Sequence, residues 1–301
     1  MLDIALIGTG GMMPTPKRFL ASAIIRYKGT SILIDCGEGT QIPLQSLGWG
    51  FKDINNILFT HYHGDHIGGL PGILWQMMLA GKTEPLNLIG PVGIEILYGL
   101  VSVVKRLPFK INLISLRDLD KSFMIDDIEI KTTPLFHGEK CLAYSFEIKR
   151  LREFDPIKAK ELNIPIQLWN KLQKGHTTFY DGREFIPDMV LGTERKGLKV
   201  SYATDCRPST SLIDFVRDSD LYIGEGMYGS DEDLPKAKEK LHSTFSETAT
   251  MAKKAGVREL WLTHYSPSLT NPKSFINVAQ KIFPNTEIGE DGKQKVLKFQ
   301  N

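Results

Sequence analysis

Cysteine, net charge and long apolar runs are all scarce in this sequence. The three cysteines, Cys36, Cys141 and Cys206, form no CxxC pair and are too scattered for a disulfide framework, which indicates a reducing compartment. The longest apolar stretch, residues 86–104, is interrupted by polar residues and proline, so no membrane span is expected. The N-terminus carries no signal-peptide pattern. We therefore expect a cytoplasmic protein.

Positive charge is nearly balanced over the whole chain but is concentrated in one segment. The 37 lysines and arginines exceed the 35 acidic residues by only two, which does not by itself call for a nucleic-acid partner. Residues 149–183, in contrast, hold eight basic and four acidic residues, with Trp169, Phe179 and Tyr180 among them. This composition predicts an excursion from the core that contacts RNA backbone and bases. The alternative is a solvated flap that covers the site.

Strand-like and helical runs alternate along the chain without an internal repeat. Strands are expected at residues 2–7, 21–27, 31–35, 54–60, 128–133, 143–148, 199–204, 221–224 and 259–263. Helices are expected at residues 68–80, 91–106, 245–255 and 272–282, the last of them closing the chain. The alternation predicts a layered α/β architecture in a single domain of residues 1–301.

The strongest signal is the segment THYHGDH at residues 60–66, which follows a predicted buried strand. His61 and His63 point to the same side of an extended chain and can bind one cation together. Gly64 permits a sharp turn into a helix, which directs Asp65 and His66 at a second position nearby. Imidazole and carboxylate ligands favour zinc, with manganese or iron as alternatives.

Three further residues can complete the donor set of a metal pair. His137 follows one predicted strand, and Asp205 and His264 each end another. Sites in open α/β sheets gather beyond the carboxyl ends of strands, so these side chains are expected beside the histidine motif. Cys206 offers a thiolate as the alternative to Asp205, but an oxygen that bridges two metals suits hydrolysis better.

A carboxylate and an imidazole are candidates for acid catalysis rather than metal binding. Glu225 ends a predicted strand, and His242 stands just before a predicted helix. Ser243 or Thr244 is expected as the N-cap of that helix, which leaves His242 without a structural explanation. A carboxylate beside an imidazole holds its tautomer and raises its pKa, which makes a general acid for an alkoxide leaving group.

These residues together resemble the ribonuclease Z family, the tRNA 3′-processing endonucleases of the metallo-β-lactamase superfamily. The resemblance covers nearly the whole chain. Besides the histidine motif it rests on DCGEGTQ at residues 35–41, GGLPG at 68–72, HST at 242–244 and THYS at 263–266. It implies the metallo-β-lactamase fold, a four-layer αββα sandwich, with an inserted flexible arm at residues 149–190 that grips tRNA. It also implies a homodimer in which the arm reaches over the partner's site.

The resemblance further implies the roles of the site residues. It places one metal ion on His61, His63 and His137, and a second on Asp65, His66 and His264. Asp205 would bridge the two ions, Asp65 would also orient the attacking hydroxide, and Glu225 with His242 would assist the leaving group. The implied activity is that of a dinuclear metal-dependent phosphodiesterase that cleaves the 3′ trailer of precursor tRNA.

The sequence departs from the family pattern at four places. The arm tip at residues 163–167 has one proline and no glycine, and the loop at residues 14–19 lacks the usual asparagine after arginine. ATDC at residues 203–206 and GEG at 224–226 replace the usual Gly-Asp-Thr and His-Glu-Ala. These changes affect substrate recognition more than metal chemistry. A phosphodiesterase for small diesters or other RNAs is therefore the alternative, followed by a thioester or lactam hydrolase and by a non-catalytic RNA-binding relative.

Overall fold

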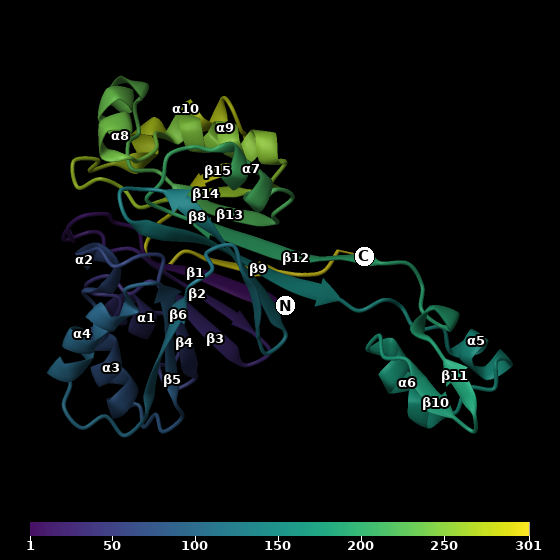
Figure 1. The fold of residues 1–301 in the computed structure, drawn as a ribbon. Coiled ribbons are helices and arrows are strands. Elements are labelled where there is room, and N and C mark those ends of the chain that lie inside the picture. Colours follow the sequence, from purple (N-terminus) through teal and green to yellow (C-terminus); the bar gives the residue numbers. More distant parts are fainter. Residues whose placement is uncertain (301) are drawn as a thin grey trace. The chain divides into compact units, whose positions relative to one another are not determined.

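Two seven-stranded sheets form the centre of the larger of two units in a computed structural model that describes residues 1–300 (Figure 1). This unit comprises Met1–Glu147 and Lys199–Lys298. The first sheet has the order β16 (Gln294–Leu297), β1 (Leu2–Gly8), β2 (Ser22–Tyr27), β3 (Thr30–Ile34), β4 (Ile54–Leu58), β5 (Leu86–Pro91) and β6 (Ile111–Leu116). Its first four strands are antiparallel and β3 to β6 are parallel, so the carboxyl ends of β3 to β6 share one edge.

The second sheet repeats this mixed design. Its order is β15 (Thr286–Ile288), β14 (Leu260–Thr263), β13 (Leu221–Glu225), β12 (Arg195–Ala203), β9 (Lys140–Arg150), β8 (Ile128–Phe136) and β7 (Ser122–Ile125). Strands β12 to β15 are parallel, whereas β7, β8 and β9 form an antiparallel meander. Strands β13 and β14 are buried throughout and β12 over its last four residues, as expected where helices cover one face and another sheet the other.

Helices cover the outer face of each sheet in this unit (Figure 1). On the first sheet lie α1 (Gln41–Ser46), α2 (Gly64–Ile67), α3 (Leu70–Leu79), η1 (Ile94–Ile96) and α4 (Leu97–Val103). On the second lie α7 (Thr210–Val216), η3 (Asp231–Asp233), α8 (Leu234–Lys240), α9 (Phe245–Ala255), η4 (Pro272–Phe275) and α10 (Ile276–Gln280). The predicted αββα sandwich is therefore confirmed.

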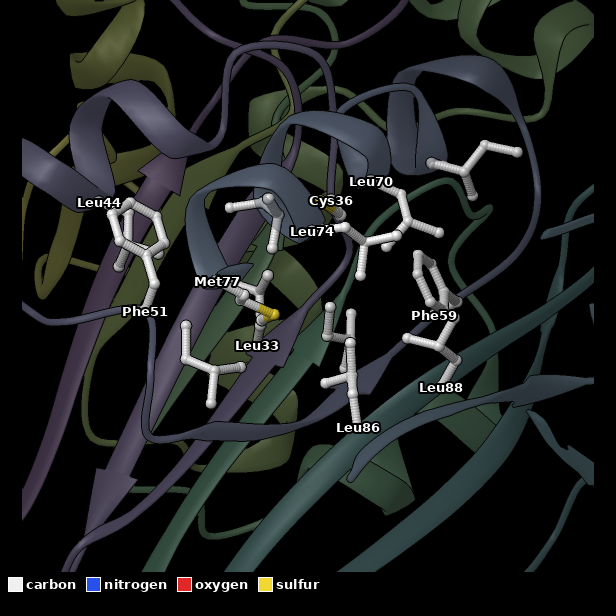
Figure 2. Packing of buried hydrophobic residues seen from close by; sticks show 14 of the residues in the cluster. Leu33, Cys36, Leu44, Phe51, Phe59, Leu70, Leu74, Met77, Leu86 and Leu88 are labelled. Atoms are coloured by element: carbon white, nitrogen blue, oxygen red, sulfur yellow. The ribbon is translucent and has the colours of Figure 1, made fainter. Parts of the chain in front are cut away.

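The hydrophobic core lies between helices and sheet in each half of the unit. Figure 2 shows the first of these clusters, in which Leu70, Leu74 and Met77 of α3 face Leu33 of β3 and Leu86 of β5. A second cluster joins α7, α9 and α10 to β13, β14 and β15. Burial of this much apolar surface fixes the strands, and with them the loops that leave their carboxyl ends.

Two predicted helices differ from the structure. The helix expected at residues 91–106 is only partly formed, because Leu86–Pro91 is the buried strand β5 and Gly93, with φ of 107°, starts a new element. The helix expected at residues 272–282 does not close the chain, since β15 and β16 follow it and complete one edge of each sheet. Both strands are only three or four residues long, too short for an alternating pattern to be recognised.

A smaller unit comprises Ile148–Leu198 and the chain from Phe299 onward. It contains α5 (Pro156–Glu161), α6 (Ile166–Gln173), the hairpin of β10 (Thr178–Tyr180) and β11 (Arg183–Phe185), and η2 (Pro187–Met189). A small core of its own joins Ile164, Leu168, Leu172, Phe185 and Val190. Within residues 1–300, no helix reaches the length and apolarity that crossing a bilayer requires.

Candidate metal centre

The candidate ligands all lie where strands end or helices begin. His61 and His63 follow β4, and Asp65 and His66 lie in α2. The others follow strands of the second sheet: His137 comes after β8, Asp205 after β12 and His264 after β14. The two sheets thus bring residues that are far apart in sequence to one edge of the sandwich.

His61, His63 and His137 form the first group. The Nε2 atom of His61 lies 2.9 Å from Nδ1 of His63, which in turn lies 3.3 Å from Nε2 of His137. His61 is fully buried, whereas the side chain of His63 is 43% exposed. Three imidazole nitrogens therefore converge on one point at the wall of the site.

Asp65, His66 and His264 form the second group. The Nε2 atoms of His66 and His264 are 3.2 Å apart, and Oδ2 of Asp65 lies 3.7 Å and 3.4 Å from them, respectively. The backbone N–H of Met12 donates a hydrogen bond of 2.7 Å to the same Oδ2 and helps to hold the carboxylate in place.

Asp205 lies between the two groups. Its Oδ2 is 3.0 Å from Nε2 of His66 and 3.2 Å from Nε2 of His264, while its Oδ1 is 4.0 Å from Nε2 of His137. One oxygen thus faces each group. Oδ2 is buried and accepts no hydrogen bond within residues 1–300.

This donor set fits two cations better than it fits a metal-free core. Ligand atoms about 2.0–2.2 Å from a tetrahedral zinc ion lie about 3.4 Å from one another. The separations within each group are close to that value, so each group can surround one cation. The orphaned Oδ2 of Asp205 is stabilised by such a cation. The residues therefore fit a dinuclear divalent metal site.

Asp35, the first residue of the DCGEGTQ segment, hydrogen-bonds to the candidate ligand His66, although no role was predicted for it. Nδ1 of His66 donates a hydrogen bond of 2.8 Å to Oδ2 of Asp35, since an ionised carboxylate only accepts. The hydroxyl of Thr60 also donates to Asp35 (2.9 Å), so its oxygen accepts from Nδ1 of His61 (3.0 Å). Asp35 thereby leaves Nε2 of one histidine in each group free for a cation. Its position at the end of β3 was the available signal.

Glu225 and His242 form the predicted carboxylate–imidazole pair. Nδ1 of His242 donates a hydrogen bond of 2.7 Å to Oε1 of Glu225. Burial opposes protonation, but the charge of Glu225 and this hydrogen bond raise the pKa of His242 above its ordinary value. Glu225 also accepts from the backbone N–H of Asp205 and of Ser243, at 3.0 Å and 2.6 Å. The carboxylate therefore ties the imidazole to the strand end that carries Asp205.

The backbone near the site is held in left-handed conformations. Asp35, Asp205 and His264 have φ values of 54°, 55° and 60°, which L-residues rarely adopt outside tightly constrained positions. Gly11 packs against the ring of His264, and a Cβ atom there would lie 2.7 Å from its Cε1. The strand-end turns and the Gly11 loop together determine where the ligands point.

Residues considered as alternatives lie outside the ligand groups. Cys206 is buried among apolar side chains, and burial raises the pKa of its thiol well above its ordinary value, so it stays protonated. His176 is exposed in the smaller unit. Thr244 caps α9 in a capping box with Glu247, as expected, and leaves His242 free for the site.

A cavity of about 460 Å³ opens onto both ligand groups. Candidate ligands from each group line it, namely His63, Asp65, His137, Asp205 and His264, together with His242. The rest of its wall comes from Met12, Tyr228, Lys236, Lys240, Ser266, Pro267 and Ser268. The space admits a phosphodiester and part of the strand beside it, and two lysines bring positive charge to it.

Two relatives that match this chain over its full length carry the name ribonuclease Z. The chain is 48% identical to ribonuclease Z of Clostridium acetobutylicum, over the whole of both chains, and 47% identical to ribonuclease Z of Lachnoclostridium phytofermentans, over 99% of each. Residues 2–150 also match the family described as anti-Pycsar protein Apyc1.

Solved structures show the same fold. Human tRNase Z, short form, superposes with a TM-score of 0.69 at 23% identity, covering 99% of this chain and all of the human one. The metallo-β-lactamase fold protein YhfI from Bacillus subtilis superposes with a TM-score of 0.70 at 18% identity, covering 98% of this chain and all of that one. The sandwich and its strand-end loops are therefore those of the metallo-β-lactamase fold.

Proposed function

This chain belongs to the ribonuclease Z family, and from that premise we propose that it is a metal-dependent endoribonuclease that removes the 3′ trailer of precursor tRNA. The observation that carries the proposal is the arrangement of the candidate ligands. They form two groups of three, Asp205 lies between the groups, and an open cavity gives access to both. Such a site suits cleavage of a phosphodiester, whose negative charge must be offset during attack.

We propose that His61, His63 and His137 hold one divalent ion, that Asp65, His66 and His264 hold the other, and that Asp205 bridges them. Zinc is the ion we favour, because nitrogen and oxygen donors in this number suit it, with manganese or iron as alternatives. A similar fold occurs in the Zn²⁺-bound PqqB of Methylobacterium extorquens, with a TM-score of 0.61 at 12% identity, over 98% of this chain and all of that one. When bound, the ions lower the pKa of water and offset phosphate charge.

The protein's own groups complete the reaction. Asp65, held by the N–H of Met12, orients the attacking water. The water oxygen bonds to phosphorus and gives up a proton to the Asp65 carboxylate as the bond to the 3′ oxygen of the tRNA breaks. His242, kept protonated by Glu225, gives its proton to that departing oxygen. These roles place Asp65, Glu225 and His242 in the catalytic machinery.

The inserted segment at residues 149–190 is the proposed tRNA-binding arm. Phe179 is 71% and Tyr180 46% exposed on its hairpin, so both can stack on bases. Trp169 is half-buried, since its ring packs 5.2 Å from that of Phe154 and its Nε1 donates to the carbonyl of Ile164. The arm would thus use charge and two aromatic residues rather than three.

We further propose that the enzyme is a cytoplasmic homodimer. The free, buried thiols of Cys36, Cys141 and Cys206 suit a reducing compartment. On α3, Trp75 and Leu79 lie four residues apart on one face and are 50% and 63% exposed, which provides apolar surface for a partner. Light scattering of the wild type against Leu79→Lys tests the dimer, which the lysine should weaken.

The function is tested by incubating zinc- or manganese-loaded protein with precursor tRNA and, separately, with bis(p-nitrophenyl) phosphate. The expected products are tRNA ending in a 3′ hydroxyl and a trailer with a 5′ phosphate. A protein that hydrolyses the small diester but leaves precursor tRNA intact would instead be a phosphodiesterase for small diesters or other RNAs, which the proline-poor, glycine-free arm tip favours. Activity on neither substrate would refute both functions.

A further inference from the structure

Two lysines stand at the rim of the metal cavity, and the surroundings of one of them, Lys236, do not explain its position. Lys236 and Lys240 of α8 both line the cavity and are exposed to solvent. Lys240 lies at the helix C-terminus and pairs with Glu239 at 3.0 Å, so helix stability accounts for its presence. Lys236 has no such reason to be where it is.

Lys236 lies in the first turn of α8, where the helix dipole disfavours a positive charge. No carboxylate lies within 4.0 Å of its ammonium group in the described part of the chain. The group lies 5.1 Å from the centre of the Tyr228 ring, and Tyr228 itself lines the cavity. An aromatic face thus steadies the ammonium at the rim while all of its hydrogen-bond donors stay available.

Helix α8 and His242 form one rigid piece. The helix ends at Leu241 in a left-handed conformation (φ 60°), and the N–H of His242 donates to the carbonyl of Ala237 at 2.9 Å. Arg207 donates to the carbonyl of His242 and pairs with Glu247 of α9, which anchors the turn. The positions of the two lysines are therefore tied to that of the proposed acid.

We infer that Lys236, with Lys240 behind it, binds a backbone phosphate of the RNA on the side of the departing 3′ oxygen. The inference rests on the proposed function, because it takes the scissile phosphate to lie at the metal centre and His242 to face the leaving group. The RNA on that side of the scissile phosphate runs past His242. It therefore reaches Lys236 and Lys240, whose helix is tied to His242 by hydrogen bonds. An ammonium group contacts a phosphate in its path through a charge-assisted hydrogen bond.

The test compares Lys236→Ala with Lys238→Ala, a lysine of the same helix that does not line the cavity. Both variants remove one exposed positive charge. For Lys236→Ala, the ratio of kcat/KM on precursor tRNA to kcat/KM on bis(p-nitrophenyl) phosphate should fall about tenfold. The salt dependence of tRNA binding should flatten by about one unit of slope. Lys238→Ala should keep the wild-type ratio, and Lys236→Arg should restore most of the loss.

The contact is located with precursor tRNAs in which one phosphate is replaced by an uncharged methylphosphonate. Every substrate that is compared carries 2′-O-methyl ribose at that position. When the linkage 5′ of the cleavage site is the uncharged one, Lys236→Ala should cause no further loss of kcat/KM on the tRNA. When the linkage 3′ of the cleavage site is uncharged instead, Lys236→Ala should lower kcat/KM as much as it does on unmodified RNA. Equal behaviour of Lys236→Ala and Lys238→Ala, or losses that add at the 5′ linkage, would overturn the assignment. Wild-type protein that fails to cut any precursor tRNA would instead refute the proposed function.

Discussion

The metal centre and the inserted unit Ile148–Leu198 present their polar groups in opposite ways. Six of the seven candidate ligands have side chains no more than 12% exposed, His63 being the exception. The inserted unit instead has charged and aromatic side chains on its surface, including Phe179 at 71% exposed. Chemistry requires groups held in one geometry by burial, whereas recognition of a large, charged substrate needs groups that remain accessible.

Substitutions in the two regions are therefore expected to have different effects. Changes to the proposed metal ligands should lower turnover on every phosphodiester, whatever its size. Changes in the inserted unit should weaken binding of RNA alone. A ligand variant that lost only RNA cleavage, or an arm variant that lost hydrolysis of a small diester, would show that the same residues serve recognition and chemistry.

The largest effect is expected for Asp65→Ala, which removes a proposed metal ligand and the group that orients the attacking water. Turnover should fall by about 10³-fold or more on precursor tRNA and on bis(p-nitrophenyl) phosphate alike. Metal content, measured by elemental analysis, should fall below two ions per chain. Asp127→Ala, a surface carboxylate paired with Lys28, serves as the control. A loss confined to tRNA would place Asp65 in recognition rather than in chemistry.

His242→Ala should lower turnover on precursor tRNA by about 10²-fold, since it removes the proposed acid. The loss should be much smaller on bis(p-nitrophenyl) phosphate, because nitrophenolate leaves without a proton. Metal content should remain that of the wild type, which separates this variant from the ligand variants. Equal losses on both substrates would mean that His242 positions other groups and does not protonate the leaving oxygen.

The sequence predicts the residues of the metal centre more completely than it predicts the structure of the inserted unit. The THYHGDH segment and the strand ends identified seven side chains that the fold brings together, because parallel strands deliver their carboxyl ends to one edge. Asp35 was missed because its partners, His66 and Thr60, lie 31 and 25 residues away, and no local pattern encodes such a contact.

In the inserted unit, composition predicted an excursion but not its internal structure. Two helices and a hairpin of three-residue strands carry signals too short to separate from a loop. The role of Trp169 could not be predicted either, since its burial depends on Phe154 and on a carbonyl five residues away. Residues 2–7 and 245–255, in contrast, were predicted nearly to their observed bounds, because long apolar periodicity determines them.

Asp35→Asn tests whether the centre depends on groups behind the ligands. The amide keeps the shape of the side chain but no longer supplies a charged acceptor to His66 and Thr60. Loss of such a partner typically costs about 10–100-fold in metal affinity. Competition with a chelator should therefore remove metal from the variant at lower chelator concentrations, while added zinc restores turnover. Unchanged affinity would show that burial alone orients the two histidines.

A smaller effect is expected for loss of the arm, and it tests the comparison most directly. The N–H of Gly192 bonds to the carbonyl of Glu153 at 2.8 Å, so a short glycine linker can join these positions and remove everything between them. KM for precursor tRNA should rise about tenfold, and the salt dependence of binding should flatten by about one unit for each phosphate contact removed. None of the proposed ligands lies in the deleted stretch, so bis(p-nitrophenyl) phosphate should be hydrolysed as by the intact protein.

Single substitutions then separate stacking from charge within the arm. Phe179→Ala should raise KM for precursor tRNA without changing the salt slope, because stacking on a base releases no counterions. Ile157→Ala, which removes another exposed apolar side chain of the same unit, is the matched control and should leave KM unchanged. If the arm-deleted protein cut tRNA as well as the intact one, recognition would have to reside in the larger unit, where Lys236 faces the cavity. The division between the two regions would then fail, and the metal centre would carry both chemistry and recognition.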